Sequence, residues 1–239
     1  MQLVVDSGNS FVKCYVFSNH TILDYNSFEY SETSKIQDFI TQYPEISRAI
    51  ECNVSGVENS ILSMFPNIAF SYFTHATPIP IINNYESKTT LGLDRLAAAV
   101  GAETVLPNSN KLIIDLGTAI TIDFVSKNQT FEGGNISLGL QSRFNALHTF
   151  TGKLPQLFPE NSITLTAKNT HQAIQNGVIQ GILFEIEGYI SAYNTIYSDI
   201  SVFLTGGDAF FFEKMVKNHI FANQNLVLIG LNRIINYNA

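Results

Sequence analysis

The chain has 239 residues, of which 45% are hydrophobic and 12% aromatic, so it can bury one large core or two medium ones. This composition excludes intrinsic disorder, collagen and coiled coil as descriptions of the whole chain. Lys and Arg number 13 against 20 Asp and Glu, which leaves a net charge of −7, so a surface that neutralises nucleic-acid phosphates is poorly supplied.

The N-terminal segment and the cysteines indicate the cellular compartment of the protein. The segment MQLVVDSGNS has no basic residue before its short apolar run, so it is neither a signal peptide nor a membrane anchor. No other run approaches the roughly 20 apolar residues that span a bilayer. Cys14 and Cys52 occur in no CxxC motif and are too few for a disulfide framework, which favours a reducing compartment. We expect a cytoplasmic protein without membrane or nucleic-acid partners.

One pattern occurs twice along the chain. Residues 2–17 read QLVVDSGNSFVKCYVF and residues 112–125 read LIIDLGTAITIDFV. Each has a strand-like run, then Asp-x-Gly-[Asn/Thr], then a second strand-like run, which predicts a hairpin whose turn displays Asp6 or Asp115. The spacing is far too long for a solenoid and favours two related halves that face one another across a cleft.

Between the hairpins, helical or mixed segments at 34–50 and 57–66 alternate with short strands at Ile50–Val54 and Ile68–Phe73, which indicates an α/β protein. A helix is predicted through Leu93–Ala102.

Thr89 or Thr90 is expected to cap that helix, which carries Asp94 and Arg95 in its first turn. The linker-like residues that follow place a boundary near residue 106. This boundary gives an N-terminal domain of residues 1–106 and a C-terminal domain of residues 107–239.

The second half predicts mainly helices. A strand is expected to end at Gly133-Gly134, and a helix is expected through Phe144–Phe150. The apolar residues of a long helix from His171 to about Tyr197 cover more than one stripe, so this helix is buried on two sides or lies in a subunit interface.

Two glycines within the long helix, Gly177 and Gly181, allow two readings. They either admit another backbone at close range or are simply tolerated. Beyond the helix, residues 200–215 read as a strand, a glycine turn at Thr205-Gly206-Gly207-Asp208, and a helix.

The two predicted hairpin turns have residues that can bind a phosphate group. P-loop, Rossmann and protein-kinase motifs are absent from the sequence. In the turn after Asp6, glycine lets backbone N–H groups approach an anion, and Lys13 supplies a positive charge. A carboxylate beside a phosphate requires a cation between them, so Asp6 and Asp115 imply a hard ion such as Mg²⁺ or K⁺. A single turn of this kind is more often a plain hairpin, but here there are two.

Two phosphate turns and a glycine turn for adenosine are the ingredients of the actin, Hsp70 and sugar kinase superfamily. We therefore expect an α/β fold of two duplicated actin-like (ribonuclease H-like) domains, with ATP in a cleft between them. The motifs DSGNS, YESKTTLGLDR, DLGTAITID, GGNISLG, KLP, NTHQAIQNG and TGGD follow one another from Asp6 onward. As an ordered set they resemble the type III pantothenate kinases over nearly the whole chain.

This resemblance implies ATP-dependent phosphorylation of pantothenate to 4'-phosphopantothenate, the first step of coenzyme A biosynthesis, by a homodimer that needs Mg²⁺ and a monovalent cation, K⁺ or NH₄⁺. The residues that match ATP contacts of the family are Asp6, Ser7, Gly8, Asn9, Ser10, Phe11, Val12, Lys13, Thr118, Gly206 and Gly207, with Asp208 completing the adenosine turn. Those that match pantothenate contacts are Tyr85, Gly92, Leu93, Asp94, Arg95 and Thr170. Asp115 matches the monovalent-cation position, and Asp6 could hold Mg²⁺ through water.

Asp94 matches the position of the family's proton acceptor. The chemistry of the Asp94 and Arg95 side chains also suits contact with the substrate. A carboxylate in the first turn of a helix stays ionised and can accept the proton of an attacking alcohol, and a guanidinium offers a bidentate fork to a carboxylate. Ser7, Ser10, Lys88 and Leu138 depart from the family pattern, but none of them removes a reactive group. The alternatives are another small-molecule kinase of the same fold, a nucleotide-binding regulatory protein without kinase activity, and an actin-like filament protein.

Overall fold

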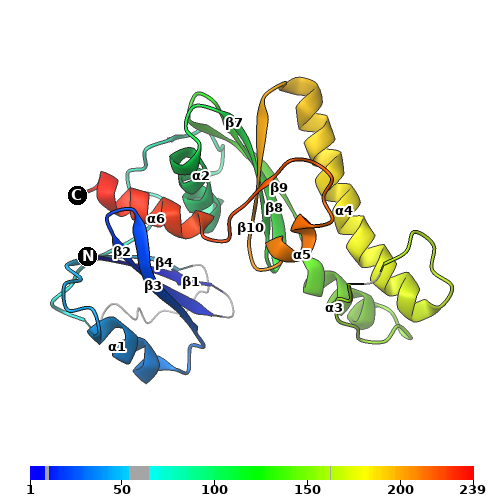
Figure 1. The fold of residues 1–239 in the computed structure, drawn as a ribbon, viewed down its shortest axis with the longest axis horizontal. Coiled ribbons are helices and arrows are strands. Elements are labelled where there is room, and N and C mark those ends of the chain that lie inside the picture. Colours follow the sequence, from blue (N-terminus) through cyan, green and yellow to red (C-terminus); the bar gives the residue numbers. More distant parts are fainter. Residues whose placement is uncertain (9–10, 54–64, 162) are drawn as a thin grey trace. The chain divides into compact units, whose positions relative to one another are not determined.

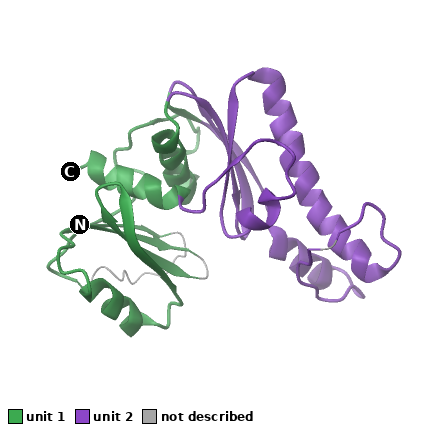
Figure 2. Ribbon diagram, viewed as in Figure 1, with its two compact units in different colours: residues 1–107, 129–131, 226–239 green, residues 108–128, 132–225 purple. Residues whose placement is uncertain are grey.

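The computed structural model describes residues 1–8, 11–53, 65–161 and 163–239. The chain forms two compact units (Figure 2). The first comprises residues 1–107, 129–131 and 226–239, and the second comprises residues 108–128 and 132–225. The main division thus falls beside the predicted boundary at residue 106, while the C-terminal segment packs with the first unit.

The first unit contains a five-stranded sheet of order β3-β2-β1-β4-β5. Its strands are β1 (Gln2–Ser7), β2 (Val12–Ser18), β3 (Thr21–Phe28), β4 (Arg48–Asn53) and β5 (Ala69–Tyr72). The first three strands are antiparallel neighbours, and β4 runs parallel to β1. Leu3, Val4 and Val5 of β1 are fully buried. Because successive side chains of a strand point to opposite faces of the sheet, both faces of β1 are covered, and Leu3 and Val5 pack in one core with residues of α1.

The second sheet has six strands in the order β6-β9-β8-β7-β10-β11, and the five strands from β9 to β11 repeat the arrangement of the first sheet. The strands of the second sheet are β6 (Ile82–Asn83), β7 (Asn110–Leu116), β8 (Ala119–Ser126), β9 (Thr130–Leu138), β10 (Ile200–Thr205) and β11 (Phe221–Ala222). Here β7 takes the place of β1, with an antiparallel partner on one side and a parallel partner on the other. Both predicted hairpins and the internal duplication are therefore confirmed.

Among the residues that the structure describes, the first unit has three α-helices: α1 (Thr33–Thr41), α2 (Leu93–Val105) and α6 (Leu226–Tyr237) (Figure 1). Helices α2 and α6 touch through their backbones, because a Cβ atom at Gly230 would lie 1.8 Å from the Ala97 oxygen. The sequence reading did not predict α6.

The predicted start of α2 is corrected in one respect. Lys88–Thr90 form a short 3-10 turn, and Gly92 occupies the N-cap position of α2, so neither Thr89 nor Thr90 caps the helix. A two-residue strand, β6 (Ile82–Asn83), precedes this turn and pairs with Thr130 and Phe131 at the start of β9. These four residues all belong to the first unit.

The second unit contains α3 (Leu140–Phe150), α4 (Thr170–Ile196) and α5 (Ala209–Glu213). Helix α4 lies beside the sheet (Figure 1), and its Ile179, Ile182 and Ile186 are fully buried.

The prediction that the strand ends at Gly133-Gly134 was wrong, because β9 continues to Leu138. A Cβ atom at Gly134 would lie 2.2 Å from Asp123 Oδ1, so this glycine admits the neighbouring strand β8 instead of breaking the chain.

Gly177 and Gly181 of α4 bring no other backbone of the described chain close. A Cβ at Gly177 would have no described atom within 4 Å, and one at Gly181 would meet only the Arg143 side chain at 3.7 Å.

Within the described parts of the chain, no helix is both long enough and apolar enough to cross a membrane.

Candidate active site

The first candidate turn begins at Asp6, the last residue but one of β1. Asp6 lies opposite Lys13 on the antiparallel strand β2 and beside Cys52 on the parallel strand β4. Burial raises the pKa of Asp6 to about 6, the Lys13 charge opposes this shift, and the Asp94 charge adds to it. Two carboxylates and one ammonium group thus share a small region of the first unit, where a bound cation would favour ionised Asp6.

This shift predicts a pH dependence of stability. The pKa of Asp6 in the folded protein, about 6, lies above its ordinary value of 3.8. The contribution of Asp6 to stability is therefore fully present below pH 3.8 and is lost as the pH rises through about 6. Without nucleotide or divalent cation, the Asp6→Asn variant should therefore show a smaller fall in unfolding free energy between pH 4 and 6 than the parent.

Urea unfolding at a series of pH values measures this difference. The exposed Asp38, on α1, provides the matched control: Asp38→Asn should retain the slope of the parent. Equal slopes for the parent and Asp6→Asn would contradict the prediction.

Hydrogen bonds among the described residues hold the chain around this turn. Ser7 Oγ donates to Glu51 Oε1 at 2.8 Å, and both residues are buried. The Tyr30 hydroxyl donates to the Gly8 oxygen at 2.6 Å, and Gly8 N–H donates to the Phe11 oxygen at 3.0 Å. Sequence reasoning missed Tyr30 and Glu51, because no local pattern links them to the turn.

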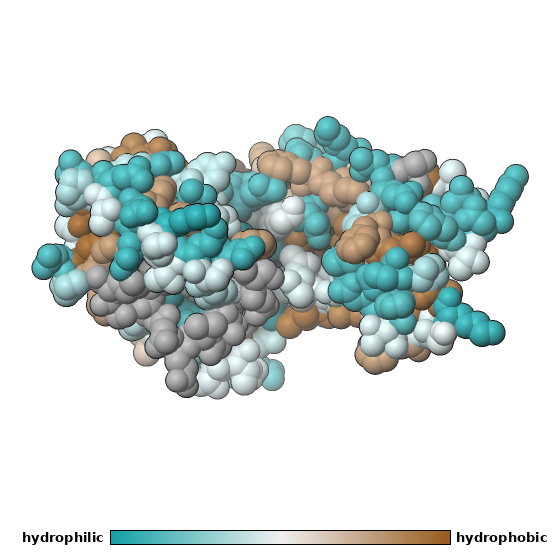
Figure 3. All heavy atoms as spheres, turned by 90° about the horizontal axis from the view of Figure 1, so that it is seen from below, coloured by the Kyte–Doolittle hydropathy of each residue, from teal (hydrophilic) through white to brown (hydrophobic). Residues whose placement is uncertain are grey.

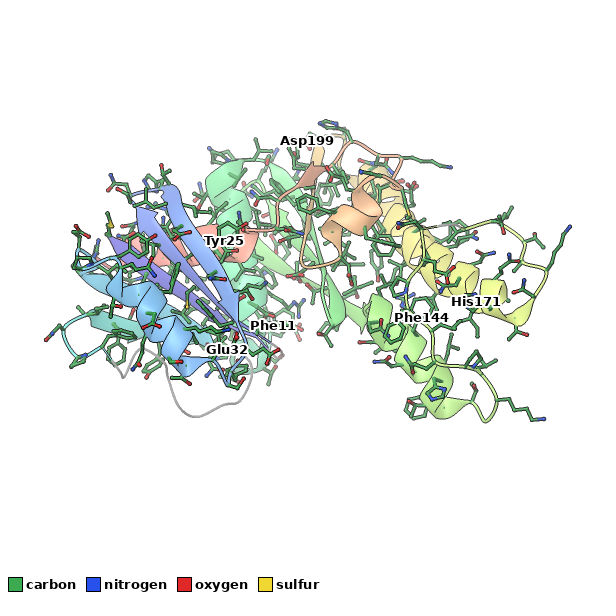
Figure 4. The ribbon with its side chains drawn as sticks, turned by 60° about the horizontal axis from the view of Figure 1, so that its bottom comes forward. Phe11, Tyr25, Glu32, Phe144, His171 and Asp199 are labelled. Carbon is green, nitrogen blue, oxygen red and sulfur yellow. The ribbon has the colours of Figure 1, made fainter. Side chains whose placement is uncertain are left out.

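The other predicted ATP contacts of this turn differ in accessibility. Asn9 and Ser10 lie outside the described residues. Phe11 is 48% exposed and lies at the end of the first sheet (Figure 4). Val12 is fully buried in the core, so only its backbone could reach a ligand, while Lys13 is half-buried.

The predicted substrate segment is built around the start of α2. Gly92 is the N-cap, and Leu93 and Asp94 begin the helix. Asp94 is half-buried, and its Oδ1 accepts a hydrogen bond from Arg95 N–H at 2.9 Å. A Cβ at Gly92 would lie 2.5 Å from that oxygen, so glycine at this position leaves room for the carboxylate.

Tyr85 and Arg95 complete this segment. Tyr85 N–H donates to Asn83 Oδ1 at 3.0 Å, which fixes the chain just after β6. The Arg95 guanidinium carbon lies 5.6 Å from the centre of the Tyr85 ring, within the range of a cation–π contact. The structure thus brings together Tyr85, Gly92, Leu93, Asp94 and Arg95 within the first unit.

The second candidate turn is supported by two glycines of other segments. A Cβ at Gly206, whose φ is +90°, would lie 2.4 Å from Asp115 Oδ1. A Cβ at Gly139 would lie 1.9 Å from the Gly117 oxygen. Asp208 N–H donates to the Leu116 oxygen at 3.0 Å. The predicted glycine turn therefore packs directly against the end of β7.

Access to this second turn is open at several positions. Thr118 and Gly207 are exposed, whereas Asp115 and Gly206 are half-buried. Burial raises the pKa of Asp208. The exposed hydroxyl of Thr118 can therefore donate to a ligand, while the half-buried Asp115 is in the kind of position where a cation would offset the cost of burying its charge.

Thr170 occupies the first position of α4, after the N-cap Asn169. It lines a cavity of about 980 Å³ between α3 and α4, with Leu147, Phe150 and Gly177 among the other lining residues. Phe150 is 85% exposed, and Figure 3 shows hydrophobic residues at several places on the surface that it draws. Thr170 thus lies beside an apolar surface of the second unit.

The donor groups fit hard cations. Asp6 and Asp115 offer carboxylate oxygens, which Mg²⁺ and K⁺ prefer. In the described part of the chain, no three His, Cys, Asp or Glu side chains are grouped to hold a metal ion. The cations named from the sequence would therefore also need oxygens from substrate, backbone or water.

Comparison with solved structures gives the class of the fold. The chain superposes with a TM-score of 0.65 and 24% identity on a Campylobacter jejuni protein assigned to the Baf family of transcriptional activators, covering 99% of this chain and 98% of that one. It also superposes with a TM-score of 0.61 and 12% identity on a Sinorhizobium meliloti protein assigned as a 2-dehydro-3-deoxygalactonokinase, with 99% of each chain covered. With the repeated strand order, these similarities define the actin-like sugar kinase fold.

The sequence comparisons narrow this class. The profile of the type III pantothenate kinase family matches residues 2–192. The type III pantothenate kinase of Cytophaga hutchinsonii is 42% identical over 100% of both chains. The chain belongs to the type III pantothenate kinase family, which confirms the resemblance inferred from the ordered motifs.

Proposed function

We propose that this chain transfers the γ-phosphoryl group of ATP to the primary hydroxyl of pantothenate, with Asp94 as the general base. Membership of the family makes the chain a pantothenate kinase, a phosphotransferase of coenzyme A biosynthesis. The observation that carries the assignment of the base is the position of Asp94 in the first turn of α2, because the partial positive charge there favours a carboxylate.

The substrate segment supports the orientation of pantothenate in this proposal. Arg95 is proposed to bind the substrate carboxylate as a bidentate fork, with Tyr85, Gly92 and Leu93 as further contacts. Asp94 then accepts the proton of the hydroxyl as that oxygen attacks phosphorus.

The two turns are proposed to contact ATP. In the first unit, Lys13 and the backbone N–H groups after Asp6 bind phosphate oxygens. In the second unit, Thr118 donates to the phosphates and the turn of Gly206 and Gly207 contacts adenosine. Asp6 is proposed to hold Mg²⁺ through water, and Asp115 a monovalent cation. When bound, these cations neutralise negative charge on the phosphates, which lowers the barrier to phosphoryl transfer.

A coupled assay with pantothenate, ATP, Mg²⁺ and K⁺ tests the proposed reaction. The expected result is formation of 4'-phosphopantothenate with consumption of ATP. Consumption of ATP with glucose or acetate but not with pantothenate would overturn the choice of acceptor. Binding of ATP without any phosphorylated product would favour a regulatory role instead.

Asp115→Ala should abolish the dependence of activity on the monovalent cation, because the variant lacks the carboxylate proposed to hold it. The rate is measured as a function of K⁺ concentration at constant ionic strength. Asp208→Ala, which removes a neighbouring carboxylate of the same unit, should retain K⁺ activation. Unchanged activation in Asp115→Ala would contradict the assignment.

We also propose that the chain acts as a homodimer through α4, with Thr170 contributing to the pantothenate pocket. The exposed apolar side chains of this helix, Phe184 at 64% and Ile196 at 71% exposure, support an interface. Sedimentation equilibrium should give twice the chain mass, and a monomer would contradict the proposal.

A further inference from the structure

Phe131 lies at the start of β9 and belongs to none of the motifs that mark the predicted site. It is fully buried and clusters with the first unit. Two backbone hydrogen bonds tie this segment to the substrate segment: Ile82 N–H donates to the Gln129 oxygen at 2.8 Å, and Asn84 N–H donates to the Phe131 oxygen at 3.0 Å. The pairing brings Phe131 beside Tyr85, although the two are far apart in sequence.

The Phe131 and Tyr85 rings both contact Arg95. The guanidinium carbon lies 5.9 Å from the centre of the Phe131 ring and 5.6 Å from that of the Tyr85 ring. The ring centres are 6.1 Å apart at an interplanar angle of 59°. Arg95 is only 6% exposed, so water screens these attractions little, and a desolvated cation–π contact is stronger than an exposed one.

The arrangement restricts the orientation of the guanidinium plane. A long arginine side chain otherwise has much rotamer freedom, and a bidentate contact with a carboxylate needs the planar fork to point in one direction. A ring that contacts the cation reduces that freedom before the substrate binds. Preorganisation of this kind improves affinity, because less ordering remains to be done on binding.

We propose that Phe131 is a positioning residue that orients Arg95 for the carboxylate of pantothenate. This inference rests on the proposed role of Arg95 in binding that carboxylate. Phe131 acts through the guanidinium and touches neither the reacting hydroxyl nor the phosphates. It makes the site selective for an acceptor that carries a carboxylate.

The Phe131→Leu variant tests this proposal, because leucine fills much of the space without offering an aromatic ring. The KM for pantothenate should rise about tenfold, the order expected for one desolvated cation–π contact. The kcat and the KM for ATP should stay close to the parent values. Phe131→Tyr, which keeps the ring, should restore the KM for pantothenate.

Phe17 provides the matched control, since it is also a buried phenylalanine of the first unit, with 1% exposure. Phe17→Leu should lose a comparable amount of packing yet leave the KM for pantothenate unchanged. The melting temperatures of both variants show whether either is merely unfolded. A tenfold rise in KM in the Phe17→Leu variant as well would overturn the proposal, because it would then reflect general loss of packing.

A double-mutant cycle with Arg95→Gln separates the roles of the two residues. If Phe131 acts through Arg95, Phe131→Leu should have no further effect on the KM for pantothenate in the Arg95→Gln background. An equal rise in both backgrounds would overturn the inference. Should Arg95→Gln fail to fold, Arg95→Lys replaces it, because lysine keeps the charge but not the planar fork.

The experiments distinguish a failure of the Phe131 proposal from a failure of the proposed function on which it rests. If Arg95→Gln leaves the KM for pantothenate unchanged, Arg95 does not bind the carboxylate, and the role of Phe131 is overturned with it. If the parent chain forms no phosphopantothenate, the proposed reaction itself is wrong, and no comparison of variants is needed to show it.

Discussion

Asp94→Asn should lower kcat by about 100-fold or more while leaving the affinity for ATP nearly unchanged, because general-base catalysis contributes on that scale. The substitution keeps the shape of the side chain, and the amide oxygen can still accept the hydrogen bond that Asp94 Oδ1 receives from Arg95 N–H at 2.9 Å. The start of α2 should therefore be preserved, and the loss should reflect the missing proton acceptor.

Steady-state kinetics with pantothenate and calorimetric titration with ATP measure the two quantities. Asp38→Asn, at an exposed carboxylate of α1, controls for the change in net charge and should turn over at the parent rate. An Asp94→Asn enzyme with the kcat of the parent would remove Asp94 from the role of base.

A second large effect is expected at the contact between α2 and α6. Gly230→Ala should lower the free energy of unfolding by about 3 kcal/mol, the upper part of the usual range for overpacking. The new Cβ would lie 1.8 Å from the Ala97 oxygen and 2.9 Å from the Gly101 nitrogen. Both of these are backbone atoms, so a side-chain rotation cannot relieve the overlap, and the helices must move apart.

Gly188→Ala is the matched control, because Gly188 also lies within a helix, and no described atom is within 4 Å of its would-be Cβ. Alanine there should stabilise the fold by up to about 1 kcal/mol through helix propensity. Urea unfolding of both variants measures the difference. If Gly230→Ala unfolds at the same urea concentration as the parent, the close contact of the two helices does not limit stability.

The two predictions concern the same helix. Asp94 and Arg95 lie in the first turn of α2, and Gly101 lies about two turns further on, where α6 packs against it. The position of the proposed base thus depends on a helix from the C-terminal end of the chain. The close packing of α6 on α2 also explains why residues 226–239 cluster with the first unit and not with the segment that precedes them in sequence.

The sequence predicted the elements whose signals are local. The two hairpins follow from β-branched runs on both sides of an Asp-x-Gly turn, and α4 follows from its long apolar periodicity. The strand, glycine turn and helix around Gly206 were also predicted. The error at Gly133-Gly134 arose because a glycine pair read as a break, whereas Gly134 admits Asp123 of the adjacent strand.

The sequence by itself determined the duplicated hairpins, the turn chemistry and, through ordered motifs, the family of this protein, because those properties depend on residues close together in the chain. Only the tertiary structure decided that Glu51 and Tyr30 hold the first turn, that α6 packs on α2, and that Phe131 contacts Arg95. Each of these contacts joins segments far apart in sequence, and their pairing follows from sheet register and helix packing, which no local pattern specifies.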